Sequence, residues 1–279
     1  MLSEPKSVTA ATTPAPLTVT GETRLYVVIG DPIAQVRSTH LYNSLAAEGG
    51  HDAVFAPLQF SAEDFETAIS ALRIFRNLAG IIPTIPHKAR MLEMVDEARP
   101  RARMVGAVNS IRVEPDGRWI GEAFDGVGYV EGLKANGHDP DGKSVQLLGA
   151  GGAGASMAFA LAEAGISHLR IFDIDGMKAE KVSAGLAEHF PGLGVELGPP
   201  DPKLVDIVAN ATPVGMRAED PLPIDPDRLV QGQLVTDMIM KPPVTPLLEA
   251  AAAMGCPTVR GYEALKGQAS ANLAFFGFI

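Results

Sequence analysis

A glycine-rich stretch is the clearest chemical signal in this 279-residue sequence. Gly149 to Gly154 reads G-x-G-x-x-G, between the apolar run 144–148 and the helix-forming run 155–164. In such a turn the first glycine allows the tight bend. The second lets the backbone approach a pyrophosphate, and the third lets helix and strand pack closely. The N–H groups and the dipole of the following helix favour phosphate anions. The stretch therefore predicts a dinucleotide site, which we favour over a glycine-rich turn of no function.

An acidic residue at the end of the next predicted strand supports this interpretation. Asp173 follows the apolar run 168–172 and lies 19 residues after Gly154 (173 − 154), close to the usual spacing. A carboxylate at this position can accept hydrogen bonds from ribose hydroxyls, and it would repel a 2′-phosphate. No arginine follows it in the run Asp173-Ile174-Asp175. The sequence therefore predicts NAD as the cofactor, in preference to NADP.

Lys88 and Asp125 are two further charged residues at positions that suit chemistry. Lys88 follows a loop with two prolines at the end of a predicted strand, and Asp125 lies where a loop enters a predicted helix. Loops after strand ends are where α/β folds place ligands. Taken singly, each residue is more simply a solvated charge or a helix cap. Sequence spacing does not show that the two meet in space.

The elements that would position these residues alternate between strands and helices. Strands are expected at 24–29, 53–57, 79–82, 108–113, 118–121, 144–148, 168–172, 195–197, 206–210, 234–238 and 258–259, with an edge strand at 17–20. Helices are expected at 39–48, 62–72, 88–95, 99–105, 125–136, 155–164, 177–189, 245–254 and 263–276, after a loosely held extension over 1–16. This alternation predicts an α/β fold with mostly parallel sheets.

The composition limits the partners and the location of the protein. A net charge of −10 argues against nucleic acid or an anionic membrane as the main partner. Cys256 is the single cysteine, which suits a reducing cytoplasm. The first residues do not resemble a signal peptide, and no apolar run reaches 18 residues. We expect a cytoplasmic monomer or homodimer with a small-molecule substrate. We expect no metal, because His40, His51 and His87 lack metal-ligand spacing.

A series of short blocks in a fixed order resembles the shikimate/quinate dehydrogenase family. The blocks are Gly30 to Ile33, Gly80 to Lys88, Gly106 to Asn109, Phe124 to Gly126, Gly149 to Ala153, Asn210 to Met216, Asp237 with Thr245 to Leu248, and Gly261 with Gln268. The resemblance extends from Tyr26 to Phe275, which is most of the chain.

The resemblance implies two α/β domains with a cleft between them. Residues 1–124, completed by the last helix at 261–279, would bind substrate, and residues 125–260 would form a Rossmann NAD-binding domain. The implied reaction is reversible hydride transfer between nicotinamide and a hydroxyl of shikimate, quinate or a related cyclic polyol carboxylate. Lys88 and Asp125 would be the catalytic dyad, as a base or an electrostatic anchor.

The resemblance also implies the remaining site residues. Substrate would contact Lys88 and Asp125 together with Ser38, Thr84, Asn109 and Gln268. Cofactor would contact Gly149, Ala150, Gly151, Gly152, Ala153, Asp173, Asn210, Thr212, Pro213 and Gly261.

Several positions depart from the family pattern on the side expected to hold substrate. Of the serine pair that holds the substrate carboxylate only Ser38 remains, because Val36 replaces the other. Ile82 replaces an asparagine, Phe124 a threonine, and Met240 the tyrosine that supports the carboxylate. A site that loses two or three charge-assisted hydrogen bonds should bind shikimate poorly. Two explanations stay open: compensation through Arg37, His87 or Tyr262, or a change of substrate.

The same departures motivate a second hypothesis from another functional class. The chain would then be a dinucleotide-binding protein that has lost catalysis and acts as a sensor or assembly partner. Lys88, Asp125, Asn109 and Gln268 are all retained. We favour the dehydrogenase because decay alone should not spare all four.

Overall fold

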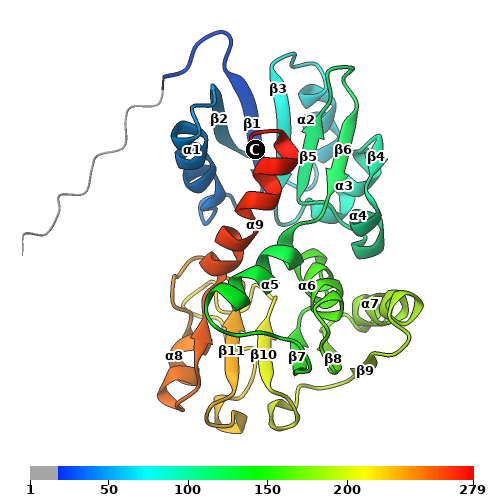
Figure 1. Cartoon of the computed structure of the whole chain (residues 1–279), viewed down its shortest axis with the longest axis vertical. Helices are drawn as coiled ribbons and strands as arrows, with labels where there is room; N and C mark the ends of the chain where they lie inside the picture. Colours follow the sequence, from blue (N-terminus) through cyan, green and yellow to red (C-terminus); the bar gives the residue numbers. More distant parts are fainter. Residues whose placement is uncertain (1–17) are drawn as a thin grey trace, which may run out of the picture.

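A computed structural model describes residues 18–279 of the chain and shows two six-stranded sheets, one above the other in Figure 1. The first sheet has the order β2-β1-β3-β5-β6-β4. Its strands are β1 (Arg24–Gly30), β2 (Ala53–Gln59), β3 (Leu78–Pro83), β4 (Glu97–Ala98), β5 (Ser110–Val113) and β6 (Trp119–Glu122). The pairs β3–β5 and β5–β6 are antiparallel, and the other pairs are parallel.

The second sheet is parallel throughout and has the order β12-β11-β10-β7-β8-β9. Its strands are β7 (Ser144–Leu148), β8 (His168–Phe172), β9 (Gly194–Leu197), β10 (Ile207–Asn210), β11 (Leu234–Asp237) and β12 (Thr258–Val259). The chain adds strands to one side of β7 and then to the other, so the strand order reverses there. This is the position where an open α/β sheet binds its ligand.

Helices cover both sheets. They are α1 (Ser38–Glu48), α2 (Phe65–Leu72), α3 (Lys88–Met94), α4 (Pro100–Val105), α5 (Asp125–Ala135), α6 (Gly152–Glu163), α7 (Gly176–His189), α8 (Pro246–Ala253) and α9 (Gly261–Phe276). Helices α5 and α9 lie side by side between the two sheets, so the last helix returns to the first sheet (Figure 1). The prediction of an α/β fold with a substrate-binding part and a Rossmann part is confirmed.

Some predicted elements differ from the structure. Helix α6 begins at Gly152, three residues before the predicted start, so two glycines of the turn lie inside its first turn. The short strand β4 was not predicted, because two residues carry no alternation of apolar and polar side chains. Residues 18–20 are not a strand, and the predictions for 1–17 lie outside the described residues. Over residues 18–279, no helix is both long and apolar enough to cross a membrane.

Candidate active site

Lys88 and Asp125 meet although 37 residues separate them. Each is the first residue of its helix, α3 and α5 respectively. The Nζ atom of Lys88 lies 2.6 Å from Oδ2 of Asp125. The two side chains are only 15% and 11% exposed. In a largely buried ion pair of this kind, removal of either partner leaves an uncompensated charge.

The ion pair lies beside the glycine-rich turn. A Cβ atom added to Gly152 would stand 3.4 Å from Cβ of Lys88 and 3.6 Å from its Cδ. The stem of Lys88 therefore lies against the first turn of α6. The carboxyl end of β3, which leads into Lys88, faces the carboxyl end of β7, which leads into the turn.

The turn itself fits the pyrophosphate of a dinucleotide. Gly149 has φ +94°, a conformation that side chains rarely adopt, and Gly154 leaves no room for a Cβ beside the carbonyl of Gly149. Nothing lies within 4 Å of a Cβ built on Gly151. No side chain caps α6, so the N–H groups of its first turn can donate to phosphate oxygens.

The other predicted cofactor residues come from neighbouring strand ends. The side-chain oxygen of Asn210 accepts hydrogen bonds from the N–H and hydroxyl of Thr212, at 3.1 and 2.7 Å. Thr212 packs against Gly149 at the glycine-rich turn. Gly261 is the first residue of α9 and packs against the backbone of Met238. Pro213, which follows Thr212, is exposed. Ala150 is buried and Ala153 partly buried, on either side of the start of α6.

Asp173 is held by the backbone around the turn. Its Oδ2 accepts from the N–H of Ala150 at 2.7 Å, and its Oδ1 accepts from the N–H of Asp175 at 2.8 Å. Both oxygens therefore already bind protein groups. The carboxylate braces the turn, a function that its sequence position alone does not indicate.

A buried cluster of polar side chains lies next to the ion pair. Asn109 donates from Nδ2 to Oε1 of Gln268 at 3.0 Å, and Oδ1 of Asn109 accepts from the N–H of Phe124 at 2.7 Å. This links two predicted substrate residues to the residue that precedes Asp125. Thr84 lies near Gly30 at the end of β1, and Ser38 is buried at the start of α1.

Three members of this buried cluster were missed from the sequence. Tyr42, Ser110 and Asn272 join it through hydrogen bonds and are at most 1% exposed. A usable signal existed, because Asn272 lies four residues after Gln268 in the same predicted helix, and so on the same face.

The positions that depart from the family pattern lie mostly in one apolar cluster. Ile82 and Phe124 are buried there, and the partly buried Val36 packs against it. His87 is fully buried, and its Nε2 lies 3.1 Å from the carbonyl oxygen of Phe60. Burial lowers the pKa of His87, so this side chain is neutral at pH 7. It supplies no positive charge to replace the lost groups.

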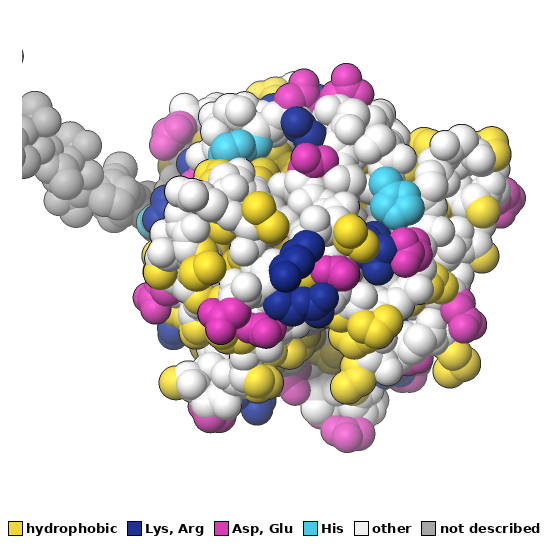
Figure 2. All heavy atoms as spheres, turned by 90° about the horizontal axis from the view of Figure 1, so that it is seen from below, with side chains coloured by type: hydrophobic (Ala, Val, Ile, Leu, Met, Phe, Trp, Pro, Cys, Tyr) yellow, Lys and Arg dark blue, Asp and Glu magenta, His cyan; other side chains and the backbone are white. Residues whose placement is uncertain are grey.

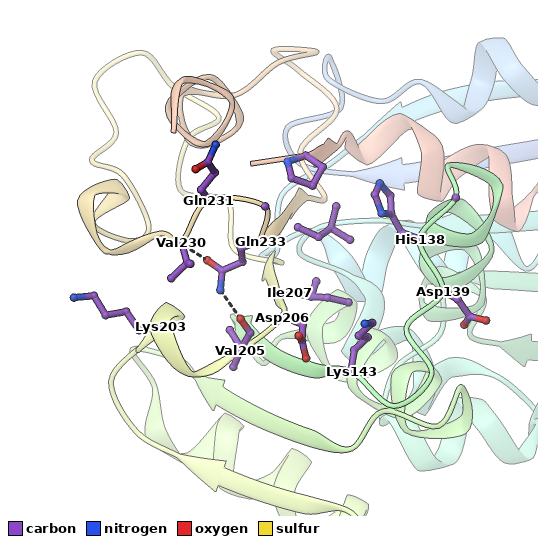
Figure 3. A pocket seen from close by; sticks show the side chains of 14 residues that line it. His138, Asp139, Lys143, Lys203, Val205, Asp206, Ile207, Val230, Gln231 and Gln233 are labelled. Atoms are coloured by element: carbon purple, nitrogen blue, oxygen red, sulfur yellow. Dashed lines mark hydrogen bonds between the residues drawn. The ribbon is translucent and has the colours of Figure 1, made fainter. Parts of the chain in front are cut away.

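A depression of about 500 Å³ in the described surface lies away from the ion pair. It is at the amino ends of β7, β10 and β11, the edge of the sheet opposite the glycine-rich turn, where Lys143, Asp206 and Gln233 line it (Figure 3). Basic and acidic side chains lie next to one another on the lower face of the molecule (Figure 2). Within residues 18–279, no group of three or more acidic, histidine or cysteine side chains could hold a metal.

Comparisons with known proteins agree with this geometry. The family model of the shikimate dehydrogenase substrate binding domain matches residues 28–111. A shikimate dehydrogenase (NADP(+)) of Rubrobacter xylanophilus is 37% identical over 251 residues, covering 87% of each chain. This chain belongs to the shikimate dehydrogenase family. A second relative in this family, from Rhodospirillum rubrum and of the same name, is 35% identical and covers 93% of this chain and 94% of its own.

Solved structures place the whole fold in the same family. A shikimate dehydrogenase crystallised with NADP⁺ superposes with a TM-score of 0.85 at 27% identity, covering 96% of this chain and 94% of its own. The family resemblance inferred from the ordered sequence blocks is thereby confirmed.

The prediction of NAD as the preferred cofactor is wrong. The curated relatives from Rubrobacter and Rhodospirillum are both named for NADP⁺. The prediction took the carboxylate of Asp173 as a free group that binds a ribose hydroxyl. Both of its oxygens instead accept hydrogen bonds from backbone N–H groups, so the glycine-rich turn accounts for Asp173 and its presence does not by itself indicate NAD.

Proposed function

We propose that this chain is an NADP-dependent oxidoreductase that interconverts a hydroxyl and a ketone on a cyclic polyol carboxylate. Shikimate is the first candidate substrate and quinate the second. The single observation that carries the proposal is the buried Lys88–Asp125 pair, placed against the first turn of the glycine-rich helix. The names of the family relatives support the cofactor and the substrate class.

In this proposal each group has one task. Bound NADP⁺ supplies the hydride acceptor at its nicotinamide. The first turn of α6 binds the pyrophosphate through backbone N–H groups. As hydride leaves carbon for the nicotinamide and the C=O bond forms, Nζ of Lys88, in its amine form, would accept the hydroxyl proton, and the carboxylate of Asp125 would stabilise the resulting ammonium. In the reverse direction this ammonium would return the proton to the new alkoxide. General acid–base help of this kind accelerates a reaction about 10²- to 10⁴-fold.

Substrate binding falls to the neutral polar groups. Asn109, Gln268, Thr84 and Ser38 would hydrogen-bond the ring hydroxyls and the carboxylate. Because apolar Val36 and Ile82 stand where the family pattern has polar side chains, we expect weak anchoring of the carboxylate. A KM for shikimate of about 1 mM or above is the expected result.

A substrate and cofactor screen tests the proposal. The purified chain is assayed with shikimate and with quinate, each with NADP⁺ and NAD⁺, by the absorbance of the reduced nicotinamide. We expect turnover of at least one acid, with a higher kcat/KM for NADP⁺. Absence of turnover with both acids and both cofactors would contradict the proposal and favour a protein that has lost catalysis. The cytoplasmic location, the domain boundaries and the oligomeric state remain predictions.

A further inference from the structure

The five buried polar side chains beside the ion pair form a continuous hydrogen-bonded chain. Its members are Tyr42, Asn109, Ser110, Gln268 and Asn272, none more than 8% exposed. They come from α1, the segment leading into β5, and α9. Side-chain amides can point either way in isolation, so the direction of each one must be set by a partner whose role is fixed.

One end of the chain is fixed by a backbone donor. The N–H of Phe124 can only donate, and it lies 2.7 Å from Oδ1 of Asn109. The Nδ2 atom of Asn109 is therefore turned the other way, toward Oε1 of Gln268 at 3.0 Å. This contact orients the Gln268 amide with its oxygen toward Asn109.

The other end is fixed by a backbone acceptor. The main-chain carbonyl of Gln268 can only accept, and Nδ2 of Asn272 donates to it at 3.2 Å. The same Nδ2 donates to the hydroxyl oxygen of Tyr42 at 2.8 Å, while Oδ1 of Asn272 accepts from the hydroxyl of Ser110. Burial raises the pKa of Tyr42, and the nearby charge of Asp125 raises it further, so Tyr42 remains a neutral hydroxyl.

Both ends impose the same direction on Gln268. Its Oε1 accepts from Asn109 and also lies 3.4 Å from Nδ2 of Asn272. Within residues 18–279, the Nε2 atom of Gln268 donates to no other residue. This atom is also not fully buried, because it does not belong to the buried polar atoms that lack a hydrogen-bond partner. The Nε2 group therefore remains available as a donor at the open side of the cluster.

We propose that Asn272, braced by Tyr42 and Ser110, is a positioning residue that keeps the NH₂ group of Gln268 directed at the substrate. The substrate atom bound there must then be a hydrogen-bond acceptor, such as a carbonyl, carboxylate or hydroxyl oxygen. This inference rests on the proposed function, in which Gln268 binds substrate. It explains why a polar side chain is buried four residues along the same helix face.

Replacement of Asn272 by leucine tests the proposal. Asn272→Leu keeps the volume and removes the contact of Nδ2 with Oε1 of Gln268, so the contact with Asn109 alone then orients the Gln268 amide and holds it less firmly. We expect KM for the polyol acid to rise roughly five- to tenfold, with kcat within about twofold of wild type. The matched control is Gln233→Met, which removes a buried amide at the opposite edge of the second sheet. The control should lower the melting temperature and leave KM unchanged.

A second background separates positioning from a general loss of stability. When Asn272→Leu is added to Gln268→Ala, KM should change by less than about twofold, because the side-chain amide that Asn272 positions is already absent. An unchanged KM in Asn272→Leu, or an undiminished effect in the Gln268→Ala background, would overturn the inference. If Asn272→Leu does not fold, Ser110→Ala and Tyr42→Phe replace it, with KM expected to rise about two- to threefold. Wild type that turns over no substrate contradicts the proposed function instead.

Discussion

At the scale of single residues, Asp237 is the buried carboxylate with the clearest consequence for stability. It ends β11 and is 2% exposed. Burial raises its pKa from 3.8 to about 6, although the hydroxyl of Thr245 and the N–H of Ile239 donate to it. Between pH 4 and 6 the folded chain therefore holds more protons than the unfolded chain. The contribution of Asp237 to the free energy of unfolding therefore falls as pH rises through this window.

Replacement by asparagine should remove this pH dependence. The difference between the two pKa values corresponds to roughly 3 kcal/mol. The free energy of unfolding of Asp237→Asn, measured by urea unfolding at each pH, should therefore rise relative to that of wild type by about 3 kcal/mol as the pH goes from 4 to 7. Thr245→Val removes a donor to the charged form and should steepen the loss above pH 5. A constant difference between Asp237→Asn and wild type across the range would contradict the assignment.

Single residues are also where sequence reasoning reached its limit. The family resemblance predicted Lys88 and Asp125 as a dyad, yet their contact depends on two helix starts that no spacing reveals. Asp173 was located correctly at the end of β8, but the direction of its carboxylate depends on the folded turn. Asn272 was missed because its partners Tyr42 and Ser110 come from α1 and β5, which lie far from it in the sequence.

At the scale of elements, α5 and α9 approach each other through glycines. A Cβ added to Gly267 would stand 2.8 Å from the backbone N of Gly132, and closer still to the carbonyl oxygen of Gly128. Neither backbone atom can move without shifting its helix. Because these two helices connect the sheets, their separation sets the position of Asp125, the first residue of α5, relative to the first sheet.

An alanine in this contact should therefore destabilise the chain. The overlap outweighs the gain of about 1 kcal/mol that alanine brings within a helix, so Gly267→Ala should lose about 2 kcal/mol or more. Gly192→Ala is the matched control, since nothing lies within 4 Å of its added Cβ. Urea unfolding should show a change of at most about 0.5 kcal/mol for the control. Equal stability of the two variants would show that the helices can separate without cost.

Most elements were predictable from their local pattern. The central strands β7, β10 and β11 are almost wholly buried, as expected for parallel strands covered on both faces. The predicted start of α6 lies three residues too late because glycine is a poor helix former, whereas here the close approach of Gly154 to the carbonyl of Gly149 requires it. Such departures from local preference are expected at functional sites.

At the scale of the whole molecule, the two sheets share one core. A single apolar cluster extends from the first sheet through α4, α5 and α6 into the second. The stem of Lys88, which follows β3, is thereby held against Gly152, which follows β7. The arrangement of two α/β parts was predictable from the family resemblance. The residues at which each domain ends remain a proposal, because α5 and α9 pack against both parts.

The central claim is that hydride transfer depends on the Lys88–Asp125 pair, and one kinetic comparison tests it most directly. Lys88→Met keeps the stem that packs on Gly152 and removes the ammonium group. With the substrate found in the screen, kcat should fall about 10²- to 10⁴-fold, while the Kd for NADP⁺ stays within about twofold. A kcat within about threefold of wild type, in a folded variant that binds NADP⁺ normally, would contradict the account.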